Sequence, residues 1–166
     1  SIFESQGSEN YCKQSNFFAM KTIAREKPRV VIISQNSELS SENAQLFTRK
    51  LHELGVAKVV FVGRPPEWRE SLPKLVFRGM SKPIAAESKK GLLQENVSRN
   101  LLVTSSSLQI GIKDVYINLC GALCTRNGCQ VFLGEEIERG ITTLDQHHIT
   151  PTVSEYASRS LLIPNI

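Results

Sequence analysis

Two short runs of β-branched residues, separated by one helical segment, constrain the fold of this chain more than any other feature. The runs are Arg29–Ser34 (RVVIIS) and Val56–Val62 (VAKVVFV). A strand that is apolar on both faces is covered on both faces, as in a parallel sheet between helices. The segment between them has a capping serine at Ser40, apolar residues at helical spacing, and Gly55 as its stop. Strand, helix and strand in this order predict a right-handed crossover within an α/β sheet.

The rest of the chain adds elements of the same kind. Apolar periodicity predicts further helices over residues 10–25, 86–108 and 151–163, and a third strand over 113–118. No internal repeat or low-complexity linker divides the 166 residues, which are enough for one domain with a proper core. We therefore expect a single three-layer α/β/α domain over residues 1–166, with a parallel sheet of the flavodoxin-like kind. In such sheets, ligands bind at the carboxyl ends of the strands.

Charge and hydropathy exclude two classes of function. The net charge of +4 comes from dispersed Lys and Arg, and no stretch interleaves basic and aromatic residues as nucleic-acid surfaces do. No apolar run has the length of a membrane span, and no signal peptide is present. Because the sequence starts at Ser1 without an initiator Met, we expect it to be an excised piece of a longer protein.

The four cysteines indicate in which cellular compartment the protein is found, because disulfides form only where the environment is oxidising. Cys120, Cys124 and Cys129 have a spacing that fits no common zinc motif, and Cys12 is distant. A disulfide from Cys124 to Cys129 would close a short loop around Asn127-Gly128, a strong tight-turn dipeptide. Cys12 and Cys120 could then form a second bridge. Two disulfides would indicate an oxidising compartment, and free cytosolic thiols are the alternative.

Asp145 and His148 form the candidate catalytic pair. They lie three residues apart, directly before Thr150-Pro151, which reads as a helix start with a hydroxyl cap and proline at the first helical position. A carboxylate that accepts one imidazole N–H sets the tautomer of a histidine base and stabilises the imidazolium that forms. An Asp-x-x-His spacing is by itself usually a surface pair, so its surroundings must decide.

Those surroundings resemble a known family. Three segments carry the resemblance: KPRVVIISQN, KVVFVGRPPEW, and DVYINLCGALCTRNGCQVF followed by TTLDQHHITPTVSEYAS. In this order they resemble the SGNH hydrolase superfamily, specifically the C-terminal portion of the extracytoplasmic SGNH domain that is fused to membrane acyltransferases of the acyltransferase-3 family. The match runs from about Cys12 to the C-terminus.

The resemblance implies roles for three residues. It implies that His148 is the catalytic base, that Asp145 is its carboxylate partner, and that Asn36 stabilises the oxyanion. It implies O-acyltransferase or esterase activity on envelope polysaccharide such as O-antigen or peptidoglycan, with no cofactor. The implied partners are a saccharide acceptor, an acyl donor and the membrane acyltransferase domain of the parent chain. The implied location is the periplasm, with the parent attached to the inner membrane.

One departure from the family is serious. The nucleophilic serine belongs to a Gly-Asp-Ser motif at the end of the first strand, and this sequence contains no Gly-Asp-Ser and lacks the family's next glycine block. The serines present lack the strand-to-turn context of a nucleophile; they are Ser34, Ser37 and residues 105–107. The chain is then a fragment of an active parent, a degenerate domain kept for carbohydrate binding or assembly, or a domain whose missing strand comes from a second chain. By itself it should not catalyse acyl transfer by this mechanism.

The remaining candidates have ordinary alternatives. Arg64, after the second strand, could meet an anionic substrate, although a surface arginine is the default; Trp68 could contact substrate or close the core. We expect His147 to be a solvated neighbour or a polar group that supports the base, and His52 to be a surface residue. A His147/His148 metal site lacks a third ligand of suitable spacing, so no metal is expected. A plain disulfide-stapled structural domain is a further alternative.

Overall fold

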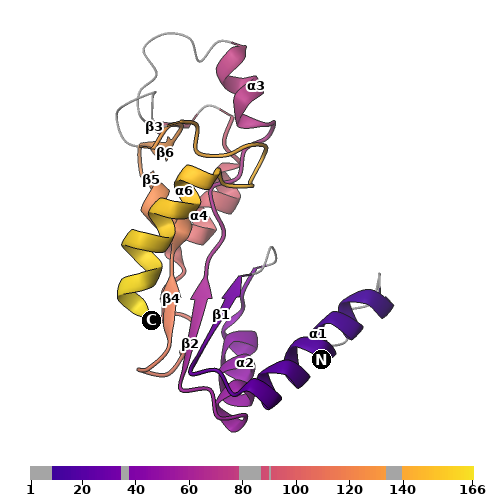
Figure 1. Ribbon diagram of the computed structural model, residues 1–166. Coiled ribbons are helices and arrows are strands. Elements are labelled where there is room, and N and C mark those ends of the chain that lie inside the picture. The colour runs from indigo at the N-terminus through magenta and orange to yellow at the C-terminus, as the bar shows by residue number, and fades with distance from the viewer. Residues whose placement is uncertain (1–8, 35–37, 79–86, 90, 134–139) are drawn as a thin grey trace.

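A parallel sheet of three strands forms the lower half of the molecule (Figure 1). The computed structural model describes residues 9–34, 38–78, 87–89, 91–133 and 140–166. The strands are β1 (Val30–Ser34), β2 (Lys58–Val62) and β4 (Val115–Ile117), in the order β1-β2-β4. All pairs are parallel, with Val30 opposite Lys58 and Val60 opposite Val115. This confirms the predicted α/β class with a parallel sheet.

Helices cover this sheet, and one of them extends beyond it. α2 (Ser41–Glu53) begins where predicted, with the Ser40 side chain accepting from the backbone N–H of Asn43 at 3.2 Å. α1 (Glu9–Glu26) packs Met20 and Ile23, in its second half, on the core, and its first half projects away from the sheet (Figure 1). The buried residues of this core are Ala44, Leu51, Val56, Val59, Phe61 and Leu108. Every helix within the described ranges is too short or too polar to cross a membrane.

A second core lies beyond the carboxyl ends of the parallel strands. It is enclosed by α3 (Leu72–Phe77), α4 (Gln94–Leu102), α5 (Leu119–Leu123) and α6 (Pro151–Ala157). A small antiparallel sheet joins them, in the order β3-β6-β5; its strands are β3 (Glu87–Ser88), β6 (Gly128–Gln130) and β5 (Cys124–Thr125). The buried members of this core are Trp68, Leu72, Leu92, Val97, Leu119, Cys120, Leu123, Cys124, Cys129, Val131, Phe132 and Val153.

The long helix predicted over residues 86–108 is wrong in extent. Only Gln94–Leu102 is α-helical, because Gly91 has a φ of +80° in the left-handed region and interrupts the chain before it. A Cβ at Gly91 would lie 2.6 Å from Cδ1 of Leu75, so the packing of α3 requires glycine there. The last helix is also shorter than predicted, since α6 is followed by a π-helical turn, Ser158–Leu162, and a 3₁₀ turn, Ile163–Asn165.

One predicted disulfide is confirmed and the other is wrong. Cys124 and Cys129 are bonded, and they face each other across the β5–β6 ladder. Cys120 is instead a free thiol, fully buried in the second core, with its Sγ 3.9 Å from the carbonyl oxygen of Val97 and 3.7 Å from Sγ of Cys124. Because the Cys120 thiol is free, the predicted Cys12–Cys120 bridge is not formed; the Cys12 side chain lies outside the part of the chain that the structure describes.

Candidate active site

The segment before α6 is a short closed loop. Thr143 and Ile149 form an isolated antiparallel bridge, and the backbone N–H of Leu144 donates to the carbonyl of His148 at 2.8 Å. Thr150 then accepts from the backbone N–H of Val153 at 3.4 Å through its side chain, with proline at the first helical position. The helix start expected from Thr150-Pro151 is thus present, and it fixes the end of the loop.

Asp145 holds this loop together through both carboxylate oxygens. Its Oδ1 accepts from the backbone N–H of His147 at 2.9 Å and from that of His148 at 2.8 Å. Its Oδ2 lies 2.6 Å from Nδ1 of the His148 ring. The two backbone N–H groups, followed by the His148 side chain, hold the pKa of Asp145 well below its usual range. The carboxylate is therefore ionised at neutral pH.

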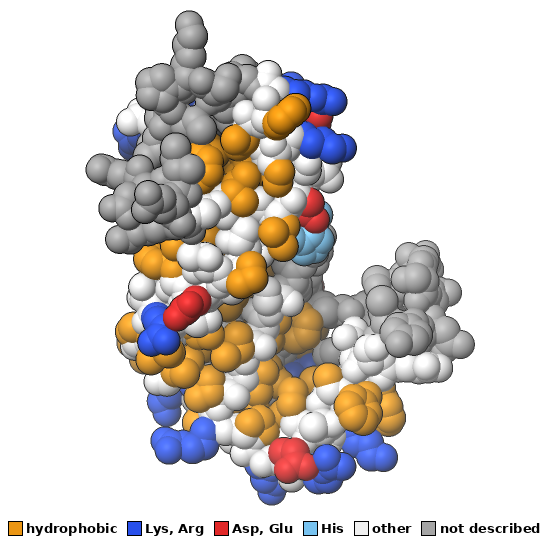
Figure 2. Space-filling view, turned by 45° about the horizontal axis from the view of Figure 1, so that its top comes forward, with side chains coloured by type: hydrophobic (Ala, Val, Ile, Leu, Met, Phe, Trp, Pro, Cys, Tyr) orange, Lys and Arg blue, Asp and Glu red, His pale blue; other side chains and the backbone are white. Residues whose placement is uncertain are grey.

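His148 has the arrangement of a general base. Because the Asp145 carboxylate is ionised, Nδ1 of His148 carries the proton and donates to it, which leaves the lone pair of the neutral ring on Nε2. The His148 side chain is 68% exposed, and within the described ranges no hydrogen bond engages Nε2. Figure 2 shows exposed histidine surface beside an acidic side chain. This geometry leaves Nε2 free to accept a proton from a group brought to it.

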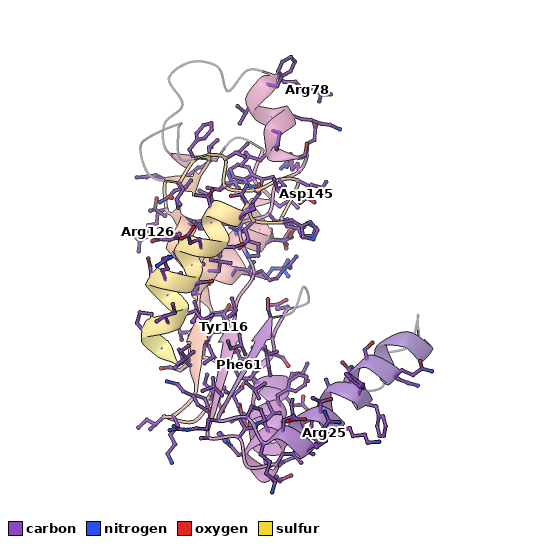
Figure 3. The ribbon with its side chains drawn as sticks, in the orientation of Figure 1. Arg25, Phe61, Arg78, Tyr116, Arg126 and Asp145 are labelled. Carbon is purple, nitrogen blue, oxygen red and sulfur yellow. A yellow bond between two sulfur atoms is a disulfide. The ribbon has the colours of Figure 1, made fainter. Side chains whose placement is uncertain are left out.

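The segment that follows β2 anchors the loop. The backbone N–H of Trp68 donates to the carbonyl of Gln146 at 2.8 Å, and that of Leu72 donates to the carbonyl of Asp145 at 3.1 Å. The Gln146 side chain returns a bond to the carbonyl of Arg69 at 3.1 Å. These contacts hold Asp145 beyond the carboxyl ends of the parallel strands, as Figure 3 shows. This anchor was not predicted; Pro65-Pro66, which fix an extended backbone, are the sequence signal that could have indicated it.

The three other candidate site residues, Trp68, Arg64 and Asn36, have different outcomes. Trp68 is fully buried in the second core, which agrees with the alternative that it closes the core and not with substrate contact. The guanidinium of Arg64 pairs with Glu67 at 2.9 Å, and the same Glu67 oxygen accepts from the Asn96 side chain at 2.9 Å. Arg64 is thus part of a local polar network, and substrate binding by it stays a prediction. Asn36 lies outside the described residues.

A small cavity lies at the carboxyl ends of β1 and β2. It has a volume of about 20 Å³, and its lining includes Gly63, Arg64 and Tyr116. A Cβ at Gly63 would collide with the Tyr116 hydroxyl, so glycine is required there. The cavity has room for about one water molecule, which is too small for a sugar.

His147 lies beside His148 as predicted for a neighbouring polar group, whereas His52 is less exposed than predicted. The rings of His147 and His148 have centroids 4.3 Å apart. Asp145, His147 and His148 can each present a ligand atom such that all three atoms lie within 4.8 Å of one another, so Asp145 is a candidate for the third ligand whose absence argued against a metal site. His52 is only half-exposed, because its Nε2 lies 3.0 Å from the buried carboxylate of Asp114.

Comparison with known proteins shows a related fold. No protein-family model matches the sequence, and no curated protein matches it at a significant level. Among solved structures, the chain is similar to the periplasmic domain of a lipopolysaccharide acetyltransferase from Salmonella ser. Paratyphi A, with a TM-score of 0.73 and 22% sequence identity. The similarity covers 90% of this chain and 61% of the other, so this chain spans about three fifths of that protein's length.

Proposed function

We propose that this chain is the part of an extracytoplasmic SGNH-type O-acyltransferase or esterase domain that carries the base and its orienting carboxylate, and that the domain modifies cell-envelope polysaccharide. The observation that carries the proposal is the 2.6 Å contact between Asp145 Oδ2 and His148 Nδ1, with the ring of His148 exposed beside it. The similar fold of a lipopolysaccharide acetyltransferase periplasmic domain supports a polysaccharide acceptor, for which O-antigen or peptidoglycan is our proposal.

The proposed chemistry is acyl transfer through a serine ester. A serine Oγ attacks the acyl carbonyl while Nε2 of His148 takes the hydroxyl proton, and Asp145 stabilises the imidazolium. The intermediate collapses, its bond to the leaving group breaks, and His148 returns the proton to that group. A sugar hydroxyl then attacks the acyl-serine, with His148 taking its proton and returning one to the serine. Asn36 is our proposed donor to the oxyanion, a role whose loss costs about 10²–10³ in turnover.

The nucleophile must come from outside this sequence, because no Gly-Asp-Ser is present. We place it on a strand that pairs with the free edge of β1 and comes from another part of the same polypeptide or from a second chain. Among the described residues β1 pairs with β2 alone, and Ile32 on it is 48% exposed although it belongs to an apolar strand. A groove of about 340 Å³ lies beside β1, between α1 and α2. The greater length of the similar solved domain is consistent with an additional strand.

The same proposal includes a location and partners. The domain lies in the periplasm, where the Cys124–Cys129 disulfide is stable, and the parent protein is attached to the inner membrane. A membrane acyltransferase domain of the parent supplies the acyl group, and a polysaccharide receives it. No cofactor takes part in the proposed steps.

A catalytically inactive carbohydrate-binding or assembly module is the second candidate, and the missing Gly-Asp-Ser favours it. The two functions differ in what they require of His148. A binding module needs the surface around the loop but no base, whereas acyl transfer needs the lone pair of Nε2.

The test compares two histidine variants in the full-length gene product from which this sequence derives. His148→Ala should abolish polysaccharide O-acylation in cells, and Asp145→Asn should reduce it by about 10⁴, as is typical when the orienting carboxylate of a triad is lost. His147→Ala is the matched control and should leave acylation intact. This chain alone should hydrolyse p-nitrophenyl acetate no faster than buffer. Full acylation by His148→Ala would refute the proposal, and saccharide binding that is indifferent to the same change would support the binding module.

A further inference from the structure

Three potential metal ligands lie together on the loop before α6. Asp145, His147 and His148 can bring one ligand atom each to within 4.8 Å of the other two, and no other such group occurs among the described residues. One carboxylate and two imidazoles form a donor set that suits Zn²⁺ and related transition ions, whereas Mg²⁺ and Ca²⁺ prefer oxygen ligands alone.

The separation of the donors is close to what an ion requires. Zinc binds nitrogen and carboxylate oxygen at ~2.0–2.2 Å, so two ligands of one tetrahedral ion lie ~3.3–3.6 Å apart. No two of these donor atoms are more than 4.8 Å apart, so the widest separation has to shorten by at most about 1.5 Å, which changes of side-chain torsion in His147 and His148 can supply. The His148 side chain is 68% exposed and that of Asp145 is 46% exposed, so water can complete the coordination sphere.

The backbone that carries the donors is fixed before any ion binds. The loop is closed by the Leu144–His148 bond, and the N–H groups of Trp68 and Leu72 hold the carbonyls of Gln146 and Asp145. Asp145 Oδ1 is occupied by two backbone N–H groups, which leaves Oδ2 as the oxygen for an ion. An ion can thus replace the proton that Oδ2 now shares with His148.

We infer that this loop binds a divalent transition ion of the Zn²⁺ type through Asp145, His147 and His148. The bound ion uses a ring nitrogen of His148, so the ring can no longer act as a base while the ion is present. The binding stands on the geometry of the loop, and only its inhibitory consequence rests on the proposed function. Because each imidazole must be unprotonated to bind, affinity decreases as the pH is lowered.

Zn²⁺ titration by isothermal calorimetry, in a non-coordinating buffer without reductant, tests the binding on this chain. The unchanged protein should bind one ion, and His147→Asn should weaken binding at least about tenfold, as the loss of a ligand or its support does in metal sites. His52→Gln removes the chain's other histidine and is the matched control, which should bind like the unchanged protein. The visible absorption of bound Co²⁺ should likewise be similar in the unchanged protein and in His52→Gln, and weaker in His147→Asn. No binding, or equal binding by His147→Asn, would overturn the inference.

A second measurement separates the inference from the proposed function. In the full-length protein, Zn²⁺ should inhibit acyl transfer, and His147→Asn should require at least about tenfold more ion for the same inhibition. Zn²⁺ binding together with full activity of His148→Ala would leave the metal site standing and refute the acyltransferase proposal. Activity that depends on His148 but is insensitive to Zn²⁺, with no binding by calorimetry, would refute the metal site alone.

Discussion

Replacing His52 with glutamine should make the stability of this protein less dependent on pH. Nδ1 of His52 lies 2.7 Å from the carbonyl of Val56, and its Nε2 lies 3.0 Å from Oδ2 of Asp114. The other Asp114 oxygen accepts from the backbone N–H of Val59 at 2.7 Å, so this carboxylate links α2 to the starts of β2 and β4. Both ring nitrogens face acceptors, and only the imidazolium can donate to both.

The pKa of His52 is accordingly raised from 6.5. The hydrogen bond to Asp114 is the largest cause and the carbonyl of Val56 the next, while burial and the charge of Lys113 act in the opposite direction. A group whose pKa is raised by folding contributes stability that is fully present below its unfolded value and is lost as pH rises through the folded value. The contribution of His52 is therefore present below pH 6.5 and decreases above it.

The size of the effect follows from the two hydrogen bonds. A hydrogen bond to a charged group contributes about 1.5–3 kcal/mol. The His52 side chain is 35% exposed, and solvent screening lowers this to about 1 kcal/mol for the protonated ring. In a chain of this size, 1 kcal/mol corresponds to about 2–4 °C in Tm.

Urea denaturation of the unchanged protein and of His52→Gln, at intervals from about pH 5.5 to 8.5, measures this contribution. The unchanged protein should exceed the variant in free energy of unfolding most at the acid end, and the difference should shrink as pH rises. Titration of the other two histidines is common to both proteins and cancels in the difference. A difference that is constant or grows with pH would refute the reasoning.

Three further predictions concern single residues. Gly91→Ala should lower the free energy of unfolding by about 1 kcal/mol or more, since alanine is strained at a φ of +80° and would contact Leu75; unchanged urea midpoints would contradict this. The buried Cys120 thiol, with its pKa raised to about 11 by burial, should resist Ellman's reagent in the native protein and react after denaturation without reductant. Rapid native reaction at this position, found by mapping the labelled peptide, would show that the second core is open. The carboxyl ¹³C resonance of Asp145 should remain that of the ionised form as pH falls through 3.8, because its pKa is lowered by the two backbone N–H groups; a midpoint at 3.8 would mean that the loop is not closed in solution.

The parts of the site that could be predicted depend on residues close together in the sequence. The Asp145–His148 contact spans three residues, the Thr150-Pro151 start lies directly behind it, and the Cys124–Cys129 bridge closes around Asn127-Gly128. Spacing, capping chemistry and turn preference act over such distances. The pairing of His148 with a carboxylate was therefore accessible to sequence reasoning, whereas the sharing of that carboxylate with two backbone N–H groups was not.

Contacts between segments that are distant in the sequence hold the loop of Asp145 and His148 in place. The hydrogen bonds from Trp68 and Leu72 to the loop join residues that are more than seventy positions apart in the sequence. The contact between His52 and Asp114 joins residues that are 62 positions apart. The burial of Trp68 and the free state of Cys120 follow from which helices enclose the second core.

By itself, the sequence determined the parallel strands, the crossover between β1 and β2, and the start of α6, because apolar periodicity and capping are local properties. Only the tertiary structure showed where α4 begins, because a glycine in the sequence does not by itself indicate a left-handed turn such as the one at Gly91. Only the tertiary structure also brought the loop of Asp145 against the segment after β2, since hydrogen bonds between distant segments leave no periodic trace in the sequence.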